Sequence, residues 1–237
     1  TTEREFAEIS AREYANGNKN PFAQMQKILV SLDEAATPEG RNRYIVDGLP
    51  LKTYDCSQIT DGYAGMILST EEGLAKLGVA KSECVEIAGW GQATDPLKKE
   101  GRDILKPEGA FRAMNAAYEM AGASPDDVNV AEIHDCFTVM GAIGTEVIGK
   151  AGYGEGARYW AEGKAEATGE CGINTSGGLL AKGHPVGASG VAMIGWAAWQ
   201  LQGKAPEGLQ VPDPKLAATF NIGGPICASV CTVLRQA

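Results

Sequence analysis

Basic residues are scarce in this chain of 237 residues, which has 21 Lys and Arg against 30 Asp and Glu. The net charge of −9 argues against nucleic acid as the main partner, because binding to a phosphate backbone needs a basic face. An anionic small ligand stays open, since helix N-termini and backbone N–H groups can hold phosphate without net positive charge.

Long hydrophobic runs and closely paired cysteines are also missing. No apolar run reaches about 18 residues and no signal peptide is visible, so we expect a cytoplasmic, soluble protein without a membrane span. The six cysteines form no C-x-x-C pair, which argues against a zinc ribbon, and they do not look like a disulfide framework. With only two histidines, the sequence offers no evident metal-ligand cluster.

Alternating strand and helix patterns fill most of the chain and predict a layered α/β fold. Apolar runs predict strands at 63–70, 84–94, 128–137, 216–224 and 226–234. Amphipathic or apolar patterns predict helices at 1–16, 70–78, 108–122, 138–152 and 191–203. Two polar stretches, 40–62 and 154–170, are expected at the surface.

The first histidine stands in AEIHDCFTVMG (131–141), where His134 is followed directly by Asp135 and Cys136. If the predicted strand continues that far, alternation places His134 and Cys136 on the same side. A thiol near an imidazole can exchange protons near neutral pH. A single buried cysteine is more often a small apolar residue, and His-x-Cys alone leaves that interpretation open.

The second histidine, His184, lies in the glycine-rich stretch NTSGGLLAKGHPVGASG (174–190). Glycines permit positive φ and a close approach of the backbone to a ligand. The stretch leads into the apolar helix predicted at 191–203, whose free N–H groups and positive dipole end would lie near His184. An imidazole held there tends to stay neutral, fit to act as a base or a hydrogen-bond donor. The alternative is a tight turn whose histidine simply packs.

The order of these motifs resembles the thiolase family, closest to the branch of sterol-carrier-protein-linked thiolases with bacterial and archaeal acetyl-CoA acetyltransferase-like members. In that branch a strand-end His-Asp-Cys-Phe precedes Asn-x-x-Gly-Gly and Gly-His-Pro-x-Gly, and this sequence has HDCF, NTSGG and GHPVG in that order. Residues 11–26, 55–78 and 220–234 are similar to further family segments, so the resemblance covers essentially the whole chain. It implies a thiolase-like layered α/β/α fold, here the C-terminal half with a mixed sheet and a buried central helix.

The resemblance implies three catalytic residues. His184 matches the histidine that activates the nucleophilic cysteine and helps to bind the thioester oxygen. Cys136 matches the acid/base cysteine of this branch, which deprotonates the acyl-CoA α-carbon. His134 takes the place of an asparagine that supports an oxyanion site through water in other thiolases.

The resemblance also implies residues that bind coenzyme A. Ser57 falls in a loop similar to the one that contacts pantetheine, and Gly183 directly precedes the catalytic histidine. Asn221 stands where other thiolases carry a second cysteine before Ile-Gly-Gly. Cys227 and Cys231 are then expected to be core residues of the last strand.

The family's nucleophilic cysteine has no evident counterpart in this sequence. In thiolases it lies at the start of a buried helix in the N-terminal half, and no such helix precedes TTEREFAEIS (1–10). Cys56 and Cys84 lie in contexts that do not match, and Cys171 is a lesser candidate outside the family's motif. We therefore expect residues 1–60 to be part of the loop or cap segment of a thiolase-like fold and residues 61–237 to be the C-terminal thiolase-like domain.

The implied activity is that of an acyl-CoA C-acyltransferase, which cleaves β-ketoacyl-CoA thiolytically or runs the reverse Claisen condensation. This chemistry needs a nucleophile, a base for the α-proton and oxyanion sites. The resemblance implies an acyl-CoA substrate, no cofactor besides coenzyme A as substrate, and an N-terminal thiolase half or second chain that supplies the nucleophile. It also implies a homo- or hetero-oligomer and, as in some relatives, an OB-fold, zinc-ribbon partner protein.

Two other functions stay open on the sequence alone. One is a CoA-thioester retro-aldolase, although relatives with that role tend to lose the histidine and cysteine set that this chain retains. The other is a non-catalytic subunit of an acyl-CoA-binding complex, which would fit the missing nucleophile. Copurification of a cysteine-bearing N-terminal chain would separate these functions from a thiolase.

Overall fold

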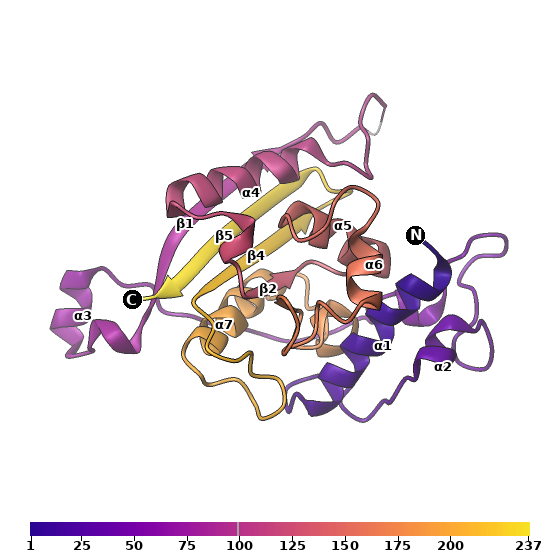
Figure 1. Cartoon of the computed structure of the whole chain (residues 1–237), viewed down its shortest axis with the longest axis horizontal. Helices are drawn as coiled ribbons and strands as arrows, with labels where there is room; N and C mark the ends of the chain where they lie inside the picture. The colour runs from indigo at the N-terminus through magenta and orange to yellow at the C-terminus, as the bar shows by residue number, and fades with distance from the viewer. Residues whose placement is uncertain (99) are drawn as a thin grey trace.

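A mixed sheet of five strands forms the centre of the computed structural model, which describes residues 1–98 and 100–237 (Figure 1). The strand order is β1-β5-β4-β2-β3. The strands are β1 Val85–Thr94, β2 Val130–Ile133, β3 Gly172–Ile173, β4 Leu216–Gly223 and β5 Ala228–Gln236. β2 is parallel to β3 and β4, whereas β5 is antiparallel to both β1 and β4.

Helices and short helical turns connect the strands. The helices are α1 Glu3–Lys19, α2 Leu32–Ala36, α3 Glu71–Leu77, α4 Glu108–Ala121, α5 Thr138–Val147, α6 Gly156–Ala161 and α7 Ser189–Leu201. The shorter turns are η1 Thr53–Asp55, η2 Lys81–Glu83, η3 Pro125–Asp127 and a π-helical turn, η4, at Gly178–Lys182. None of the helices among the described residues is both long and apolar enough to cross a membrane.

Alternation along the strands gives the sheet two apolar faces. On β4, Ala218 and Phe220 belong to the core that contains α4 and α5, whereas Ala217 belongs to the core on the α7 side. Figure 1 shows α4 lying along β1 and β5, with α7 on the other side of the sheet. The chain is therefore a layered α/β fold with a mixed sheet, as the sequence predicted, and α7 packs one side against β2 and β4.

Two glycines of β1 allow α4 to lie directly on that strand. A Cβ at Gly89 or Gly91 would meet the main-chain carbonyls of Ala117 and Ala113 closer than van der Waals contact allows. Gly122 ends α4 in the left-handed region, with φ 63°, because its backbone carries no Cβ to clash there. The helix predicted at 108–122 is confirmed.

The strand predicted at 63–70 is wrong. This segment is irregular, and Tyr63 and Ile67 are 99% and 89% exposed. Among the described residues no strand pairs with it, although β1, an edge strand of the sheet, is paired only on its β5 side. Apolar composition alone does not supply the hydrogen-bonding neighbour that a strand needs.

The exposed excursion predicted at 154–170 is wrong at α6. The segment contains α6, which packs against α1 and α5, and its Tyr159 and Trp160 are buried. The indole N–H of Trp160 donates to Oγ1 of Thr145 on α5, 2.9 Å away. Charged residues dominate the composition of this segment, so the sequence pattern did not predict that Tyr159 and Trp160 are buried.

Candidate active site

The end of β2 places His134 beside the end of β4. β2 ends at Ile133, so the strand does not continue through the motif as the alternation argument required. The main-chain N–H of His134 still donates to the carbonyl of Phe220, 2.9 Å away. Its Nδ1 lies 2.7 Å from Oδ1 of Asn221. Parallel pairing of β2 and β4 thus brings together residues that are 87 positions apart.

His184 reaches the same place from the glycine-rich loop. Its main-chain N–H donates to Oγ1 of Thr60 at 3.0 Å, and its Nδ1 lies 2.7 Å from Oγ of Ser189 in the first turn of α7. Gly183, with φ +116°, adopts a conformation that residues with side chains rarely take. The rings of His134 and His184 meet edge to face, with centroids 4.9 Å apart and planes at 87°. The structure therefore joins the two histidine motifs at a single site.

The hydrogen bonds determine which nitrogen of each ring carries the proton. Oδ1 of Asn221 is an acceptor, so His134 must donate from Nδ1. The single hydroxyl proton of Ser189 goes to the carbonyl of Pro185 at 3.1 Å, so Oγ of Ser189 accepts from Nδ1 of His184. A neutral imidazole has only one N–H, and each Nε2 is therefore left with a free lone pair.

Both histidines are held in the neutral form. Burial lowers the pKa of His134 below its usual 6.5. Burial also lowers the pKa of His184, and the neighbouring His134 ring lowers it further. The negative charge of Asp135 opposes both shifts without reversing them. Near neutral pH each ring can take up a proton at Nε2, and a protonated Nε2 can then donate to an oxygen anion.

Cys136 lies half-buried two residues beyond His134. Its main-chain carbonyl accepts from the N–H of Ser57 at 3.0 Å, and Cys56 and Phe137 form a single antiparallel bridge alongside. Burial raises the pKa of the Cys136 thiol to about 11, and the charge of Asp135 contributes to the rise. Around pH 7 the group is therefore a thiol, which is the form that can donate a proton.

A short stretch of chain connects the surroundings of Cys136 and His184. Ser57 bonds the carbonyl of Cys136, and Thr60, three residues later, bonds the N–H of His184. Three residues of chain span at most about 10 Å, so the main chains of Cys136 and His184 lie near each other. Gln24 supports the stretch, because its Nε2 donates to the carbonyl of Ile59 at 3.0 Å.

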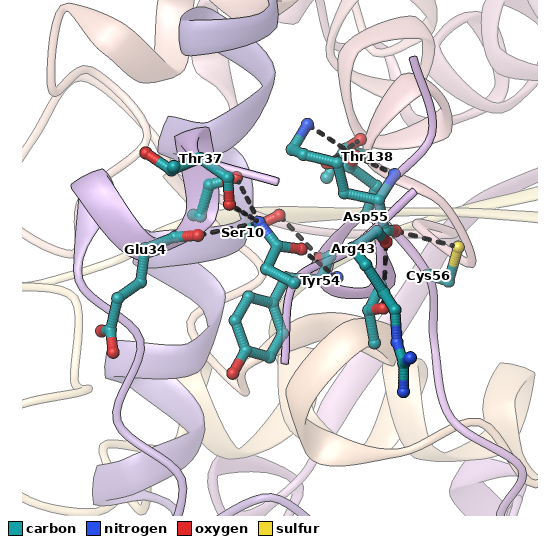
Figure 2. Close-up of polar contacts among 12 residues, drawn as sticks. Ser10, Glu34, Thr37, Arg43, Tyr54, Asp55, Cys56 and Thr138 are labelled. Carbon is teal, nitrogen blue, oxygen red and sulfur yellow. Dashed lines mark hydrogen bonds and ion pairs between the residues drawn. The ribbon is translucent and has the colours of Figure 1, made fainter. Parts of the chain in front are cut away.

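A buried polar network fixes the start of this stretch (Figure 2). Asp55 accepts from Nζ of Lys52 at 2.8 Å and from Oγ1 of Thr138, at the first turn of α5, at 3.2 Å. Ser10 of α1 donates to the carbonyl of Tyr54 at 2.7 Å. The surface prediction for 40–62 is therefore wrong at these positions, since Lys52 and Asp55 are almost fully buried. The network ties the Ser57 loop to α1 and to the start of α5, beside Cys136.

Asp135, for which the sequence predicted no role, is completely buried. Its carboxylate binds the π-helical turn that leads to His184. Its carboxylate accepts from the N–H of Leu179 at 2.8 and 3.0 Å and from that of Leu180 at 3.2 Å. A Cβ at Gly178 would collide with this carboxylate, and its φ of +58° also requires glycine. The Gly-Gly pair of NTSGG therefore lets the turn approach the buried acid.

Comparison with known proteins decides the family. A family model described as thiolase C-terminal domain-like matches residues 91–236. The chain belongs to the thiolase family. The resemblance carried by HDCF, NTSGG and GHPVG is confirmed at the level of the family.

Curated relatives match almost the whole chain. An acetyl-CoA acetyltransferase of Methanothermobacter thermautotrophicus is 33% identical over 94% of this chain and 56% of its own length. Sterol carrier protein 2 of Bos taurus is 37% identical over 94% of this chain and 40% of its own length. The benzoylsuccinyl-CoA thiolase subunit BbsB of Thauera aromatica is 32% identical, with coverages of 94% and 56%. This thiolase chain thus spans about half the length of the relatives that it matches.

Solved structures with the same fold include two at low sequence identity. The Ltp2–ChsH2(DUF35) aldolase aligns with a TM-score of 0.82 at 20% identity, over 100% of this chain and 59% of that chain. A monomeric SCP2-thiolase-like protein of Mycobacterium smegmatis aligns with a TM-score of 0.72 at 19% identity, over 99% of this chain and 47% of that chain. These similarities establish the fold of the thiolase chain.

The remaining cysteines fall into different environments. Cys171 is fully buried in the main core and burial raises its pKa to about 12, so the structure removes it as a candidate nucleophile. Cys231 is a core residue of β5, as predicted. Cys227 is not: it lies half-buried in the turn between β4 and β5, with Sγ donating to the carbonyl of Gly223. Cys84 precedes β1 at the end of the sheet away from the two histidines.

Several residues that build the site were not anticipated from the sequence. Thr60 and Ser189 bond His184 directly, whereas Asn174 bonds the main chain of Ile133, next to His134, and also Glu13. Asn174 and Ser189 lie inside the quoted motif 174–190, so the motif could have pointed to them as residues of the site. Thr60 and Glu13 are 124 and 161 residues from their partners His184 and Asn174, and no local pattern connects them.

Proposed function

We propose that this thiolase chain carries the histidine and acid/base cysteine portion of an acyl-CoA C-acyltransferase active site. The proposed reaction is thiolytic cleavage of a β-ketoacyl-CoA, or the reverse Claisen condensation. The observation that carries the proposal is the contact between His134 and His184, two neutral rings with free Nε2 lone pairs. The Ser57–Thr60 stretch links this pair to the main chain of Cys136.

In this proposal His184 activates a nucleophilic thiol. Its free Nε2 removes the thiol proton, and the resulting thiolate attacks the β-keto carbon of the substrate. Nε2–H then donates to the oxygen of the thioester. The nucleophile is proposed to come from a segment outside this chain; Cys171 and Cys231, which are buried in the core, do not supply it. Cys84 lies eight residues before Gln92, the residue of β1 that is level with Asn221, which is roughly 26 Å along the strand.

Cys136 is proposed to move the proton of the α-carbon. When the Cα–Cβ bond of the β-ketoacyl-CoA breaks, its electron pair stays on the α-carbon as a thioester enolate, and the S–H of Cys136 donates a proton to that carbon. The Cys136 thiolate then takes the proton of the incoming coenzyme A thiol, whose sulfur attacks the acyl-enzyme. The raised pKa of Cys136, about 11, suits this donation, because the group begins the cycle protonated.

His134 is proposed to support the oxyanion through water. Asn221 holds the Nδ1–H of His134, so Nε2 is left free to bind a water molecule that donates to the developing negative charge. This is the role of the asparagine that His134 replaces in other thiolases. The bond to His134 also occupies Oδ1 of Asn221, so contact of Asn221 with coenzyme A would use its Nδ2.

Coenzyme A is proposed to lie along the exposed side of the His184 loop. A hollow of about 400 Å³ lies there, lined by residues 60–64 and 185–188. Ser57 and Gly183 flank Thr60, which lines this hollow, so the predicted coenzyme A contacts of these two residues remain compatible with the arrangement. No further cofactor is needed for the proposed steps.

Partner chains also belong to the proposal. The BbsB relative is named as a subunit, and the Ltp2 relative is an aldolase solved together with ChsH2(DUF35). We expect this chain to act within an oligomer that includes a nucleophile-bearing thiolase half. An OB-fold, zinc-ribbon protein is a further proposed partner.

The test is a pair of assays on Cys136→Ser in the complete enzyme. Serine keeps the shape but has a far weaker acid group than a thiol, so exchange of acetyl-CoA methyl protons with solvent deuterium should slow by roughly 10²-fold or more. Labelling of the enzyme by radioactive acetyl-CoA should persist, because His184 is untouched. Cys84→Ser, at the far end of the sheet, is the matched control and should exchange normally.

Exchange at the wild-type rate in Cys136→Ser would make Cys136 a packing residue. A wild-type enzyme that shows neither exchange nor labelling, yet cleaves a β-hydroxyacyl-CoA by retro-aldol reaction, would replace the acyltransferase proposal with the aldolase one.

A further inference from the structure

A second buried carboxyl group, Glu13 of α1, lies behind the site. Its side chain is completely buried, and Oε1 accepts from Nδ2 of Asn174 at 2.8 Å. No donor among the described residues reaches its other oxygen, Oε2. The carboxyl group of Asp135, also completely buried, lies close by, because a Cβ placed on Gly178 would meet oxygen atoms of both Asp135 and Glu13. Two buried carboxylates this close repel each other when both are ionised, so the arrangement favours a proton on one of them.

The surroundings indicate which of the two acids carries that proton. Asp135 accepts from the backbone N–H groups of Leu179 and Leu180, and such bonds favour the ionised form. Glu13 accepts only the neutral amide of Asn174. Burial and the proximity of Asp135 raise the pKa of Glu13 well above its usual 4.5. The proton therefore belongs to Glu13.

Other ionisable groups around the pair do not neutralise Glu13. Glu132 of β2, also buried, raises the pKa of Glu13 further. Ser176 donates to Glu132 through its N–H and hydroxyl, and Lys182 lowers the pKa of Glu132, which burial raises to about 7. Tyr14, next to Glu13 on α1, is buried and its pKa is raised, so it stays uncharged.

We propose that Glu13 is a positioning residue that keeps its proton at neutral pH and donates it to Asp135. Asp135 then holds the N–H groups of Leu179 and Leu180, and so fixes the turn that carries His184 to the site. This proposal rests on the proposed function only in treating His184 as a catalytic residue. The acid pair itself can be tested without any catalytic assay.

The first measurement compares the melting temperatures of the full wild-type protein and Glu13→Gln across pH. Above about pH 4.5 the unfolded chain ionises Glu13 while the folded chain keeps it protonated, so Glu13 lowers wild-type stability increasingly as pH rises towards its folded pKa. Glutamine does not titrate. The melting temperature of Glu13→Gln minus that of wild type should therefore increase steadily between about pH 5 and pH 8. A difference that is the same at every pH would overturn the proposal.

The second measurement separates donation from mere packing. Glutamine can donate an amide N–H to Asp135 and accept from Asn174, whereas Glu13→Met has a similar shape and no donor. Amide hydrogen exchange at Leu179 and Leu180 should match wild type in Glu13→Gln and be roughly tenfold faster in Glu13→Met. Equal protection in all three proteins would overturn the positioning role, as would failure of Gln to restore protection. If Glu13→Met does not fold, the pH dependence of Glu13→Gln still decides the question.

Discussion

The stretches 128–137 and 63–70 have similar apolar runs, and the sequence predicted a strand in both. One becomes β2, paired on both sides by β3 and β4, with every residue of the strand buried. The other is irregular, and its Ile67 and Leu68 are 89% and 70% exposed. Apolar composition predicts that a stretch will be covered, but a hydrogen-bonding neighbour decides whether it joins the sheet.

The same contrast divides the site. The buried side, around Asp135 and Gly178, is fixed by contacts within this chain. The exposed side, 60–64 and 185–188, lines an open hollow where Val186 is 81% exposed. The chain thus determines where its histidines and Cys136 lie and leaves the hollow beside His184 open.

Gly178→Ala should show the largest difference between the two sides. A methyl group there requires a left-handed conformation, which costs about 1–2 kcal/mol, and meets two buried carboxyl groups, which adds about 1–3 kcal/mol. We expect the free energy of unfolding in urea to fall by about 3 kcal/mol. Gly187→Ala, where a Cβ meets nothing within 4 Å, should change it by under about 0.5 kcal/mol. Equal losses at the two glycines would abolish the distinction between a fixed and an open side.

Ser189→Ala should have an intermediate effect at the boundary between the two sides. It removes the acceptor that orients Nδ1–H of His184 and leaves the fold around Asp135 intact. One hydrogen bond of this kind contributes about 1 kcal/mol, so thiolysis by the complete enzyme should slow by up to about tenfold. Ser69→Ala, on the exposed segment, is the control. An unchanged rate in Ser189→Ala would mean that the loop orients His184 without this bond.

The smallest effect is expected for Ile67→Ser in the chain of 237 residues. Because Ile67 is 89% exposed, the free energy of unfolding should change by less than about 0.5 kcal/mol. Ile133→Val, on fully buried β2, should cost about 0.5–1.5 kcal/mol despite removing far less of the side chain. A loss of about 2 kcal/mol or more for Ile67→Ser would show that this run is buried after all.

Much of the layered fold could be predicted because periodic patterns depend only on neighbouring residues. β1, α4, β4 and β5 follow this rule, and their predicted positions are confirmed to within a few residues. The burial of Trp160 was not predicted because it depends on a contact with Thr145 on another helix. The polar composition of the segment carries no information about that contact. The meeting of His134 and His184 depends on strand order, and only the family motifs pointed to it. Glu13 could not be found, since all of its significance comes from distant partners.

The stretch from Ser57 to Thr60 has a consequence for which changes the chain can tolerate. Its first residue is bonded to the carbonyl of Cys136 and its last to the N–H of His184, with two residues between them. Substitution of Gln58 or Ile59 keeps that spacing, since Ile59 is 99% exposed. Inserting or deleting one residue would change the length by about 3.3–3.6 Å, more than a hydrogen bond can absorb. The loop therefore tolerates substitutions at its middle residues but not a change in its length.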